Sequence, residues 1–414
     1  MTDPLRAPKS PPPEVVASPR VAALAADPSA AALAAFWAEV AERGTPLVEP
    51  FDGDPDHRVV TFLWRDRGGT GEVVLMANKL TDPSVWPASV LERLPGTDVW
   101  HRSYRLRADW RASYHLAPDD DLARAAPAAP ATGPARRWSG RAAGAVPDPL
   151  NPSRFPGPEG LPELSVVELP AAPPQPWWRV RPGAPAGAVH AHRPGERVVW
   201  VYTPPGYRPT GDPLPVAVLL DGAQWTGRLA APATLDNLIA AGAIPPLIAL
   251  MPDAVDTATR WRELACSEAF LAFLTGELLP WAGGRWTISG DPADTLVAGA
   301  SLGGLTALFA GLRAPARFGC VVAQSASLWW PAQEEFAADS GRLIRAFATS
   351  PRQPLRIFLE VGLQEWIPLP LHRHLRDVLD ARGYELHYRE YHGGHDALCW
   401  RGGFADGLIS LWGR

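Results

Sequence analysis

Residues 295–303 constrain the fold of this chain more than any other segment. The run 295–300 is uncharged and mostly apolar, which predicts a buried strand, and a helical pattern follows it over 303–313. Gly299-Ala300-Ser301-Leu302-Gly303 joins the two. A Gly-x-Ser-x-Gly turn between a strand and a helix is typical of a nucleophile elbow, whose glycines permit a turn sharp enough to expose the serine hydroxyl. The alternative is a glycine-rich turn with an idle serine.

Beyond residue 190, the chain shows the alternation of strands and helices that such an elbow requires. Near-continuous apolar runs alternate with helical segments, which implies a mostly parallel sheet covered by helices on both faces. We therefore predict an α/β-hydrolase domain over residues 191–414. The predicted strands are 197–204, 215–222, 245–252, 295–300, 320–327, 355–362 and 385–391, and the predicted helices are 267–281, 303–313 and 370–382.

The first part of the chain has a different sequence pattern, in which short β-rich runs are separated by turn residues. This spacing predicts an all-β sandwich over residues 28–150, entered through a helix at 30–43 with Ser29 as its cap. Proline and alanine dominate residues 1–27, which we expect to be a disordered tail. The stretch 117–162 has no hydrophobic period, and we place a linker and connecting segment at 151–190. The β-rich runs are 59–64, 72–77 and 99–116.

Composition excludes several classes of protein. The chain has 414 residues and a net charge of −5, without the basic surplus of a nucleic-acid binder. The three cysteines are widely spaced, which gives neither a disulfide framework nor a metal-ligand pattern, so we expect a reducing compartment and no metal site. Residues 1–20 lack the apolar core of a signal peptide, and the uncharged run that includes 296–312 is shorter than the about 20 apolar residues of a membrane helix. We expect a cytoplasmic protein without membrane insertion.

A serine nucleophile needs a base to take its proton and an acid to orient that base. In the α/β-hydrolase order the acid follows a late strand and the histidine follows the next strand. Glu365 comes just after the run 355–362, and His395 comes just after 385–391. We therefore predict Ser301, His395 and Glu365 as the catalytic residues.

Neighbouring residues compete for two of these roles. His392 also lies near the end of the last strand, but the two glycines before His395 give that residue a loop that can reach inward. Glu360 and Asp396 lie nearby and are alternatives to Glu365 as the acid. A carboxylate in a loop is also often only solvated, which is the ordinary interpretation of Glu365.

An oxyanion hole needs two backbone N–H donors. Leu302, at the start of the helix after the nucleophile, is one candidate. The second is expected in the turn at the end of the run 215–222, around Asp221, Gly222 and Ala223, where glycine lets the backbone approach a substrate. An ordinary turn at the end of a strand is the alternative at Gly222.

At these residues a resemblance to a known family becomes plain. The chain resembles the enterochelin (enterobactin) esterases, within the esterase-D-like group of α/β-hydrolases, and the likeness covers nearly everything beyond residue 27. The resemblance implies an immunoglobulin-like sandwich of the E-set type before the α/β-hydrolase domain. It rests on segments 219–225, 260–264, 277–281, 299–304, 324–330 and 393–403, and in the first half on 36–50, 60–66, 94–106 and 148–152.

The family implies hydrolysis of the ester bonds in a cyclic trilactone that carries three catecholates, with iron bound, so that iron is released in the cytoplasm. Its nucleophile carries over to Ser301 and its base to His395. Some members have a complete triad and others use serine and histidine alone, which leaves the role of Glu365 open. No cofactor is implied, because iron enters only as part of the catecholate siderophore.

Such a substrate is bulky, aromatic and negatively charged, which suggests binding residues. Arg260 is a candidate partner for the negative charge, although it could instead pair with Glu263 or hold a loop. Tryptophan makes up 18 of the 37 aromatic residues, and four tryptophans lie in segments expected to border the site, although core packing is the alternative for each. These four are Trp225, Trp329, Trp330 and Trp400.

Two other functions remain open at this point. The same triad could serve a general carboxylic or carbohydrate-ester (feruloyl-type) hydrolase. A binding or scaffolding protein with a vestigial triad is the second, although Ser301 and His395 at their expected places argue against it. The sequence leaves the oligomeric state open.

Overall fold

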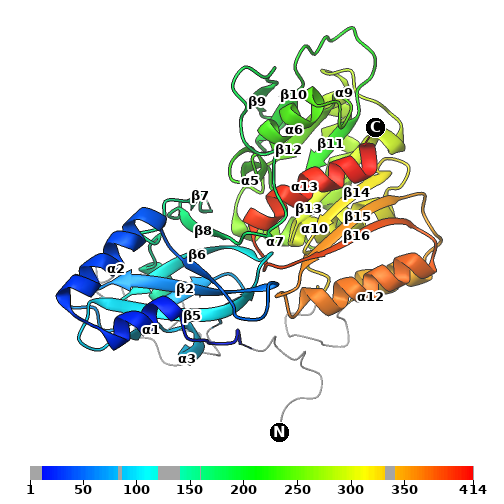
Figure 1. Cartoon of the computed structure of the whole chain (residues 1–414). Helices are drawn as coiled ribbons and strands as arrows, with labels where there is room; N and C mark the ends of the chain where they lie inside the picture. Colours follow the sequence, from blue (N-terminus) through cyan, green and yellow to red (C-terminus); the bar gives the residue numbers. More distant parts are fainter. Residues whose placement is uncertain (1–11, 83–85, 120–139, 159, 332–340, 414) are drawn as a thin grey trace. The chain divides into compact units, whose positions relative to one another are not determined.

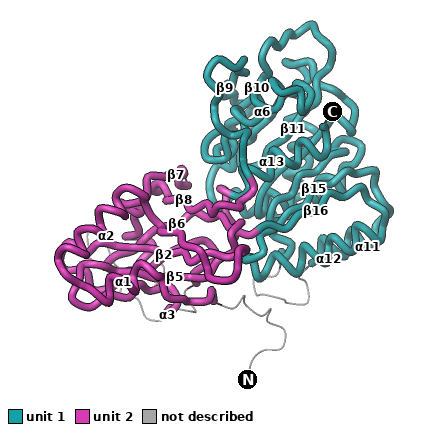
Figure 2. The backbone as a smooth tube through the Cα atoms, in the orientation of Figure 1, with its two compact units in different colours: residues 1–9, 174–391, 399–414 teal, residues 10–173, 392–398 magenta. Residues whose placement is uncertain are grey.

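The computed structural model describes residues 12–82, 86–119, 140–158, 160–331 and 341–413. The chain divides into two compact units (Figures 1 and 2). The N-terminal unit comprises Ser10–Pro173 together with the short segment His392–Leu398. The C-terminal unit contains Pro174–Tyr391 and Cys399–Arg414. A segment from near the end of the chain therefore belongs to the unit formed by its beginning.

The N-terminal unit contains two four-stranded sheets with the strand orders β1-β2-β5-β4 and β3-β6-β8-β7. Neighbouring strands in both sheets pair antiparallel. The first sheet consists of β1 (Leu47–Pro50), β2 (His57–Arg65), β4 (Glu92–Arg93) and β5 (Val99–Arg107). The second consists of β3 (Val73–Ala77), β6 (Arg111–Pro118), β7 (Arg154–Phe155) and β8 (Leu164–Glu168).

Alternate residues of the two sheets meet in one core. Phe62 of β2 and Tyr114 of β6 are both fully buried, and their rings contact edge to face with centroids 5.0 Å apart. Because successive strand residues point to opposite faces, alternate residues of β2, β3 and β6 enter this core. The unit is thus the all-β sandwich that the spacing of short strands predicts.

The prediction of a disordered tail is wrong for residues 12–27, and residues 1–11 lie outside the described ranges. Helix α1 (Pro19–Ala26) begins at Ser18, whose Oγ accepts a hydrogen bond from the N–H of Val21, and the helix buries Val21 and Leu24. The proline content that suggested disorder includes Pro19, which occupies the first helical turn, where proline is favoured. The predicted helix at 30–43 is confirmed as α2 (Ala30–Arg43), with Ser29 as its cap.

The prediction that residues 151–190 form a linker and connecting segment is also wrong in part. Strands β7 and β8 lie within it, and β8 pairs with β6 as a full member of the second sheet. The alternation of buried and half-buried side chains along β8 is that of a strand with one face on a core. Within the proline-rich stretch 117–162, residues 120–139 lie outside the described ranges. Helix α3 (Trp86–Ser89) is a single turn before β4.

The C-terminal unit contains an eight-stranded sheet in the order β16-β15-β14-β13-β11-β12-β10-β9. The pairs from β16 to β12 are parallel, whereas β10 pairs antiparallel with both of its neighbours. This is the mostly parallel sheet that the sequence predicts. Its strands are β9 (Ala188–His192), β10 (Val199–Thr203), β11 (Val216–Leu219), β12 (Ile248–Pro252), β13 (Thr295–Ala300), β14 (Cys320–Gln324), β15 (Arg356–Gly362) and β16 (Glu385–Tyr391).

Helices cover both faces of this sheet. Gly311 of α10 lies against Val321 of β14, and Gly407 of α13 lies against the next residue, Val322. Because Val321 and Val322 point to opposite faces, α10 and α13 pack on opposite sides. The helices are α5 (Gly222–Thr226), α6 (Ala231–Ala240), α7 (Thr257–Glu263), α8 (Glu268–Phe273), a π-helical stretch at Leu274–Leu278, α9 (Leu279–Gly283), α10 (Leu302–Arg313), α11 (Arg342–Thr349), α12 (Pro368–Ala381) and α13 (Ala397–Trp412).

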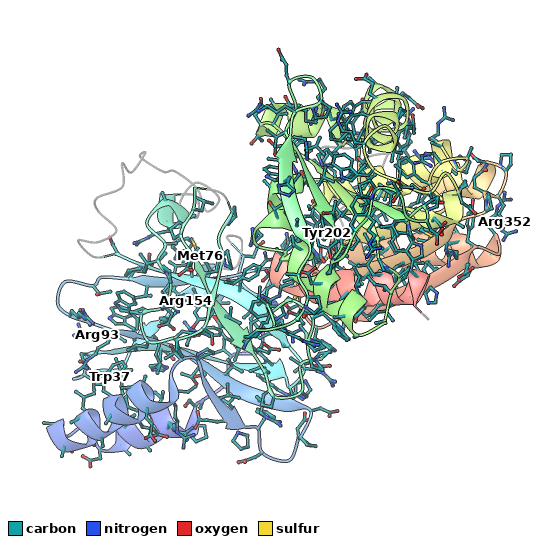
Figure 3. The ribbon with its side chains drawn as sticks, turned by 90° about the horizontal axis from the view of Figure 1, so that it is seen from above. Trp37, Met76, Arg93, Arg154, Tyr202 and Arg352 are labelled. Carbon is teal, nitrogen blue, oxygen red and sulfur yellow. The ribbon has the colours of Figure 1, made fainter. Side chains whose placement is uncertain are left out.

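The interior of the C-terminal unit is closely packed, and Tyr202 shows how a buried polar group is accommodated in it. Tyr202 of β10, labelled in Figure 3, has a buried ring, and its hydroxyl donates to Asp236 Oδ1 at 2.7 Å. Burial raises the pKa of Tyr202 far above its ordinary value, so the phenol stays neutral. Among the described residues, no helix is long and apolar enough to span a bilayer.

Candidate active site

Ser301 lies at a strained turn between β13 and α10. Its backbone has φ 58° and ψ −119°, a conformation that residues other than glycine rarely adopt. Gly299 permits the close approach of the helix, because a Cβ at this position would lie 2.3 Å from the carbonyl carbon of Gly303. The N–H of Ser301 donates to the carbonyl of Gln324 at the end of β14. This is the strand, turn and helix arrangement of a nucleophile elbow.

Parallel strands bring several predicted site residues to the same edge of the sheet. Strands β11, β13, β14 and β15 are consecutive neighbours in parallel register, so their carboxyl ends lie side by side. Gly222 follows β11, Ser301 and Leu302 follow β13, and Glu365 follows β15. The sheet thus gathers the predicted nucleophile, both predicted oxyanion donors and the predicted acid.

The turn after β11 is shaped for close approach of its backbone. Asp221 has a positive φ of 70°, and the next residue, Gly222, starts helix α5. A Cβ on Gly222 would lie 2.3 Å from the carbonyl oxygen of Met251, so only glycine fits. Leu302, buried at the first position of α10, has its N–H at the positive end of a helix. Both N–H groups come from helix starts, which suits stabilisation of a developing oxyanion.

Arg260 holds the turn that carries Gly222. Its Nε and Nη2 donate to Asp221 Oδ1 and Oδ2 at 2.7 and 2.8 Å, a bidentate pair. Glu263, the alternative partner, instead accepts two hydrogen bonds from Arg197. Of the alternatives for Arg260, holding a loop is therefore the one that the structure bears out, and its contact with a substrate stays a prediction.

Two serines after β14 contact the predicted nucleophile and the predicted acid. Ser327 Oγ lies 3.2 Å from Ser301 Oγ, and the Ser327 N–H donates to the Ser301 carbonyl. Ser325, at a positive φ of 46°, donates its hydroxyl to Glu365 Oε1 at 2.6 Å. Our sequence reasoning gave these serines no role. Their place directly after the strand beside the elbow was the signal that could have found them.

Glu365 is a fully buried carboxylate with specific donors. Besides the Ser325 hydroxyl, its Oε1 accepts the Gly362 N–H at 2.9 Å. Glu360, the alternative to Glu365 as the acid, has other partners: its carboxylate pairs with Arg389 and accepts a hydrogen bond from Gln324 Nε2 at 2.6 Å. Burial raises the pKa of Glu360, and the Arg389 charge opposes this shift.

His395 lies in the segment His392–Leu398, which is grouped with the N-terminal unit, whereas Ser301 belongs to the C-terminal unit. His392 faces Asp109, with Nε2 and Oδ2 3.9 Å apart, and burial lowers its pKa. Asp396 is buried, and its carboxylate accepts hydrogen bonds from Ser113 and from the Leu398 N–H. His392, the alternative to His395, and Asp396, the alternative to Glu365, thus both interact with side chains of the N-terminal unit.

Two of the four predicted binding tryptophans belong to the packed interior. Trp225 is 1% exposed, its Nε1 donates to the Leu220 carbonyl at 2.6 Å, and its ring packs on Phe404. A substrate cannot reach a ring buried in this way, so the prediction that Trp225 binds substrate is wrong. Trp400 is buried too, and its Nε1 donates to Ser325 Oγ at 2.9 Å. Trp400 therefore supports the serine that contacts Glu365.

Trp329 and Trp330 belong to an aromatic cluster that includes a residue missed in the sequence. The ring of Trp261 lies 6.1 Å from Trp329 and 5.9 Å from Trp330, between centroids. Trp261 is 41% exposed and the other two are half-buried. We call these three residues the tryptophan cluster. Trp261 directly follows Arg260 on α7, the residue that holds the Gly222 turn.

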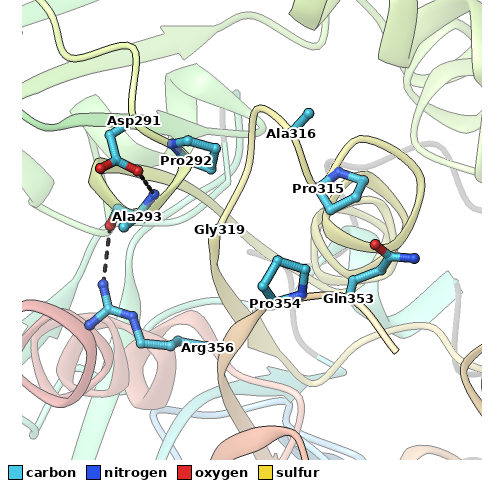
Figure 4. A pocket seen from close by; sticks show the side chains of 9 residues that line it. All are labelled: Asp291, Pro292, Ala293, Pro315, Ala316, Gly319, Gln353, Pro354 and Arg356. Atoms are coloured by element: carbon cyan, nitrogen blue, oxygen red, sulfur yellow. Dashed lines mark hydrogen bonds between the residues drawn. The ribbon is translucent and has the colours of Figure 1, made fainter. Parts of the chain in front are cut away.

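A cavity of about 490 Å³ lies at the opposite edge of the sheet (Figure 4). It is lined by Pro292 and Ala293 before β13, Gly319 before β14, and Arg356 at the start of β15. Since these are the amino ends of the strands whose carboxyl ends carry the site, this cavity is separate from the candidate active site. Among the residues that the structure describes, no group of three or more His, Cys, Asp or Glu side chains is arranged to hold a metal ion.

Comparison with known proteins matches both halves of the chain. The family described as "Enterochelin esterase, N-terminal" matches residues 59–178, and the family "Putative esterase" matches residues 192–411. The iron(III) enterobactin esterase of Dickeya dadantii (strain 3937) is 38% identical over 408 residues, covering 90% of this chain and 92% of that protein. This chain belongs to the enterochelin esterase family.

Solved structures of enterochelin esterases agree with this assignment. The ferric enterobactin esterase from Salmonella typhimurium is 34% identical with a TM-score of 0.78, and covers 90% of this chain and 98% of its own. An enterobactin esterase from Shigella flexneri, crystallised in the presence of enterobactin, is 33% identical with a TM-score of 0.73, over 91% and 97% of the two chains. The likeness to enterochelin esterases therefore extends through both units, and the family resemblance seen in the sequence is confirmed.

Proposed function

We propose that this chain is a serine esterase that hydrolyses the trilactone ester bonds of ferric enterobactin-type catecholate siderophores and so releases iron in the cytoplasm. The observation that carries the proposal is the match to iron(III) enterobactin esterases along both units, at 38% identity. The strained Ser301 elbow supplies the chemistry that such a hydrolysis needs.

In the proposed mechanism, Ser301 Oγ attacks an ester carbonyl while His395 takes the hydroxyl proton. The backbone N–H groups of Leu302 and Gly222 stabilise the oxyanion. Collapse of the intermediate breaks the bond to the leaving serine alcohol, which receives the proton from His395. A water molecule, deprotonated by His395, then attacks the acyl-enzyme and restores the Ser301 hydroxyl.

We assign the orienting acid to Glu365. Its fixed carboxylate, held by Ser325 and the Gly362 N–H, supports this role, because an orienting acid must itself be rigid. The engagement of Glu360 with Arg389 and of Asp396 with Ser113 also favours Glu365.

We assign recognition of the catecholate rings to the tryptophan cluster. Flat catechols can stack on or pack edge-to-face against indoles, and the exposed Trp261 offers such a surface beside two half-buried rings. Arg260 contributes less free charge to an anionic substrate than the sequence suggests, because Asp221 neutralises it. Iron is part of the substrate in this proposal, and the enzyme needs no resident cofactor.

We also propose the finer fold classes that the sequence suggested. The elbow and the mostly parallel sheet support an α/β-hydrolase fold for the C-terminal unit. Two antiparallel sheets around one core support an immunoglobulin-like sandwich of the E-set type for the N-terminal unit.

The test is product analysis with ferric and iron-free enterobactin. We expect the wild-type protein to produce linear trimer and smaller fragments in mass spectrometry, and Ser301→Ala to leave the trilactone intact. Ser410→Ala is the matched control, since it removes a half-buried hydroxyl that donates to the Asp406 carbonyl within helix α13. Intact siderophore beside rapid cleavage of feruloyl or aryl esters would refute the siderophore assignment and favour the carbohydrate-ester hydrolase.

A further inference from the structure

The segment that carries His395 is bound to the β-sandwich by a set of buried hydrogen bonds. The Asp396 side chain is the centre of this set. It is 2% exposed, its Oδ2 accepts the Ser113 N–H at 2.6 Å and the Ser113 hydroxyl at 2.8 Å, and its Oδ1 accepts the Leu398 N–H at 2.9 Å. The two Ser113 donors attach this buried carboxylate to strand β6 through charge-assisted hydrogen bonds, while the Leu398 donor lies in the same segment as Asp396.

The backbone on either side of Asp396 is attached as well. Asn78, directly after β3, donates its Nδ2–H to the carbonyl of His395 at 2.7 Å. The Arg111 N–H at the start of β6 donates to the His392 carbonyl at 3.2 Å. Gly394 packs so closely that a Cβ there would lie 2.5 Å from the Asn78 carbonyl oxygen.

These contacts have a clear geometric effect on His395. The segment contains two consecutive glycines, Gly393 and Gly394, whose backbone is flexible unless it is held. Here the carbonyl of residue 395 and the side chain of residue 396 are each held by the sandwich, on neighbouring strands that pair Ala77 with Tyr114. The N-terminal unit therefore holds the backbone at His395 through two neighbouring strands.

We propose that the β-sandwich positions the catalytic base, with Asn78, Ser113 and Asp396 as positioning residues that act through His395. The inference rests on the proposed role of His395. It gives the N-terminal unit a part in catalysis. Displacement of a reacting group by about 1 Å costs about 100-fold in rate, so an anchor on this segment controls the rate without touching the substrate.

The test uses a small neutral aryl ester, so that siderophore recognition plays no part. We expect Asp396→Ala to lower kcat by about 100-fold with little change in KM, and Asn78→Ala and Ser113→Ala to lower it by smaller factors, since each leaves the other attachments. Ser103→Ala is the matched control: it removes a buried hydroxyl that bonds Thr61 at 2.9 Å in the same unit, and it should leave kcat unchanged. Thermal melting checks that each variant is folded.

The decisive readout is the same set of substitutions in a His395→Ala background, where residual catalysis by the oxyanion hole remains measurable. Residues that act through His395 have no further effect there. Equal losses in both backgrounds, or an unchanged kcat in folded Asp396→Ala and Ser113→Ala, would overturn the inference. If Asp396→Ala does not fold, Ser113→Ala decides alone, because it keeps the backbone hydrogen bond to Asp396. Full activity of His395→Ala would instead reject the base assignment itself, and the inference with it.

Discussion

Arg260, which pairs with Asp221, could have either of two roles: it could hold the oxyanion turn, or it could bind the anionic siderophore. Substitution of Arg260 distinguishes them. If Arg260 holds the oxyanion turn, Arg260→Met impairs hydrolysis of every ester, including small neutral ones. If Arg260 instead binds the anionic siderophore, the variant is impaired only toward that substrate. The geometry favours the first role, because both carboxylate oxygens of Asp221 are bonded to Arg260 and Gly222 is the next residue.

The expected magnitude follows from the geometry of the turn. An oxyanion donor is worth about 3 kcal/mol, and each 1.36 kcal/mol is about tenfold in rate, so complete loss of the Gly222 N–H would lower kcat by about 100-fold. The stability loss should be about 3 kcal/mol, at the low end for a broken buried ion pair, because the Arg260 side chain is 23% exposed while Asp221 is 7% exposed.

The assay compares kcat and KM of wild type and Arg260→Met on a neutral aryl ester and on ferric enterobactin. Arg197→Met is the matched control, since Arg197 makes a similar two-bond pair with Glu263 on helix α7 and does not pair with Asp221. We expect kcat to fall on both substrates for Arg260→Met and on neither for Arg197→Met. An unchanged kcat on the aryl ester with a raised KM for the siderophore would refute the positioning role.

Four further predictions follow from individual residues. Glu365→Gln should slow aryl-ester hydrolysis less than His395→Ala does, and equal losses of kcat would contradict a secondary role for the acid. Gly299→Ala should strongly lower the melting temperature, because its Cβ would lie 2.3 Å from Gly303, whereas Gly276→Ala, with open space around it, should not; equal melting temperatures would contradict the tight elbow. Ser18→Ala should cost about 2 kcal/mol or more of unfolding free energy in denaturant titration, because it removes both a helix cap and a hydroxyl that donates to the buried Glu49 carboxylate, and no loss would argue against a folded α1. Burial raises the pKa of the half-buried Cys266 to about 12 and of the buried Cys320 to about 11, so iodoacetamide at pH 8 should label them only after unfolding; rapid labelling of the native protein would contradict these raised pKa values.

Local patterns predicted the parts of the fold that depend on local geometry. The elbow is one case, since the strand at 295–300 and the helix at 303–313 correspond to β13 and α10 with only the first helical residue shifted. The pattern of apolar residues along the strands likewise predicted the sandwich and the mostly parallel sheet. Strands of a sandwich alternate apolar and polar residues, whereas strands of a parallel sheet are apolar almost throughout. Helix α1 was missed because proline was interpreted as disorder rather than as a helix start.

Contacts between distant residues could not be predicted in this way. The sequence does not reveal that Arg260 pairs with Asp221, 39 positions away, or that Asp396 accepts hydrogen bonds from Ser113, 283 positions away. Trp225 shows the same limit, since its segment borders the site while its ring packs on Phe404. A tryptophan in a loop beside a site can point either way, and only the packing of the whole unit decides which.

The most direct test of the proposed function is to quench a reaction with ferric enterobactin within a single turnover and map the peptides by mass spectrometry. We predict that the peptide containing Ser301 carries the ring-opened siderophore as an ester, that this adduct decays as linear trimer appears, and that Ser301→Ala shows neither. Formation of linear trimer by the Ser301→Ala variant, or an intact trilactone with the wild-type protein, would contradict a serine esterase acting on this siderophore.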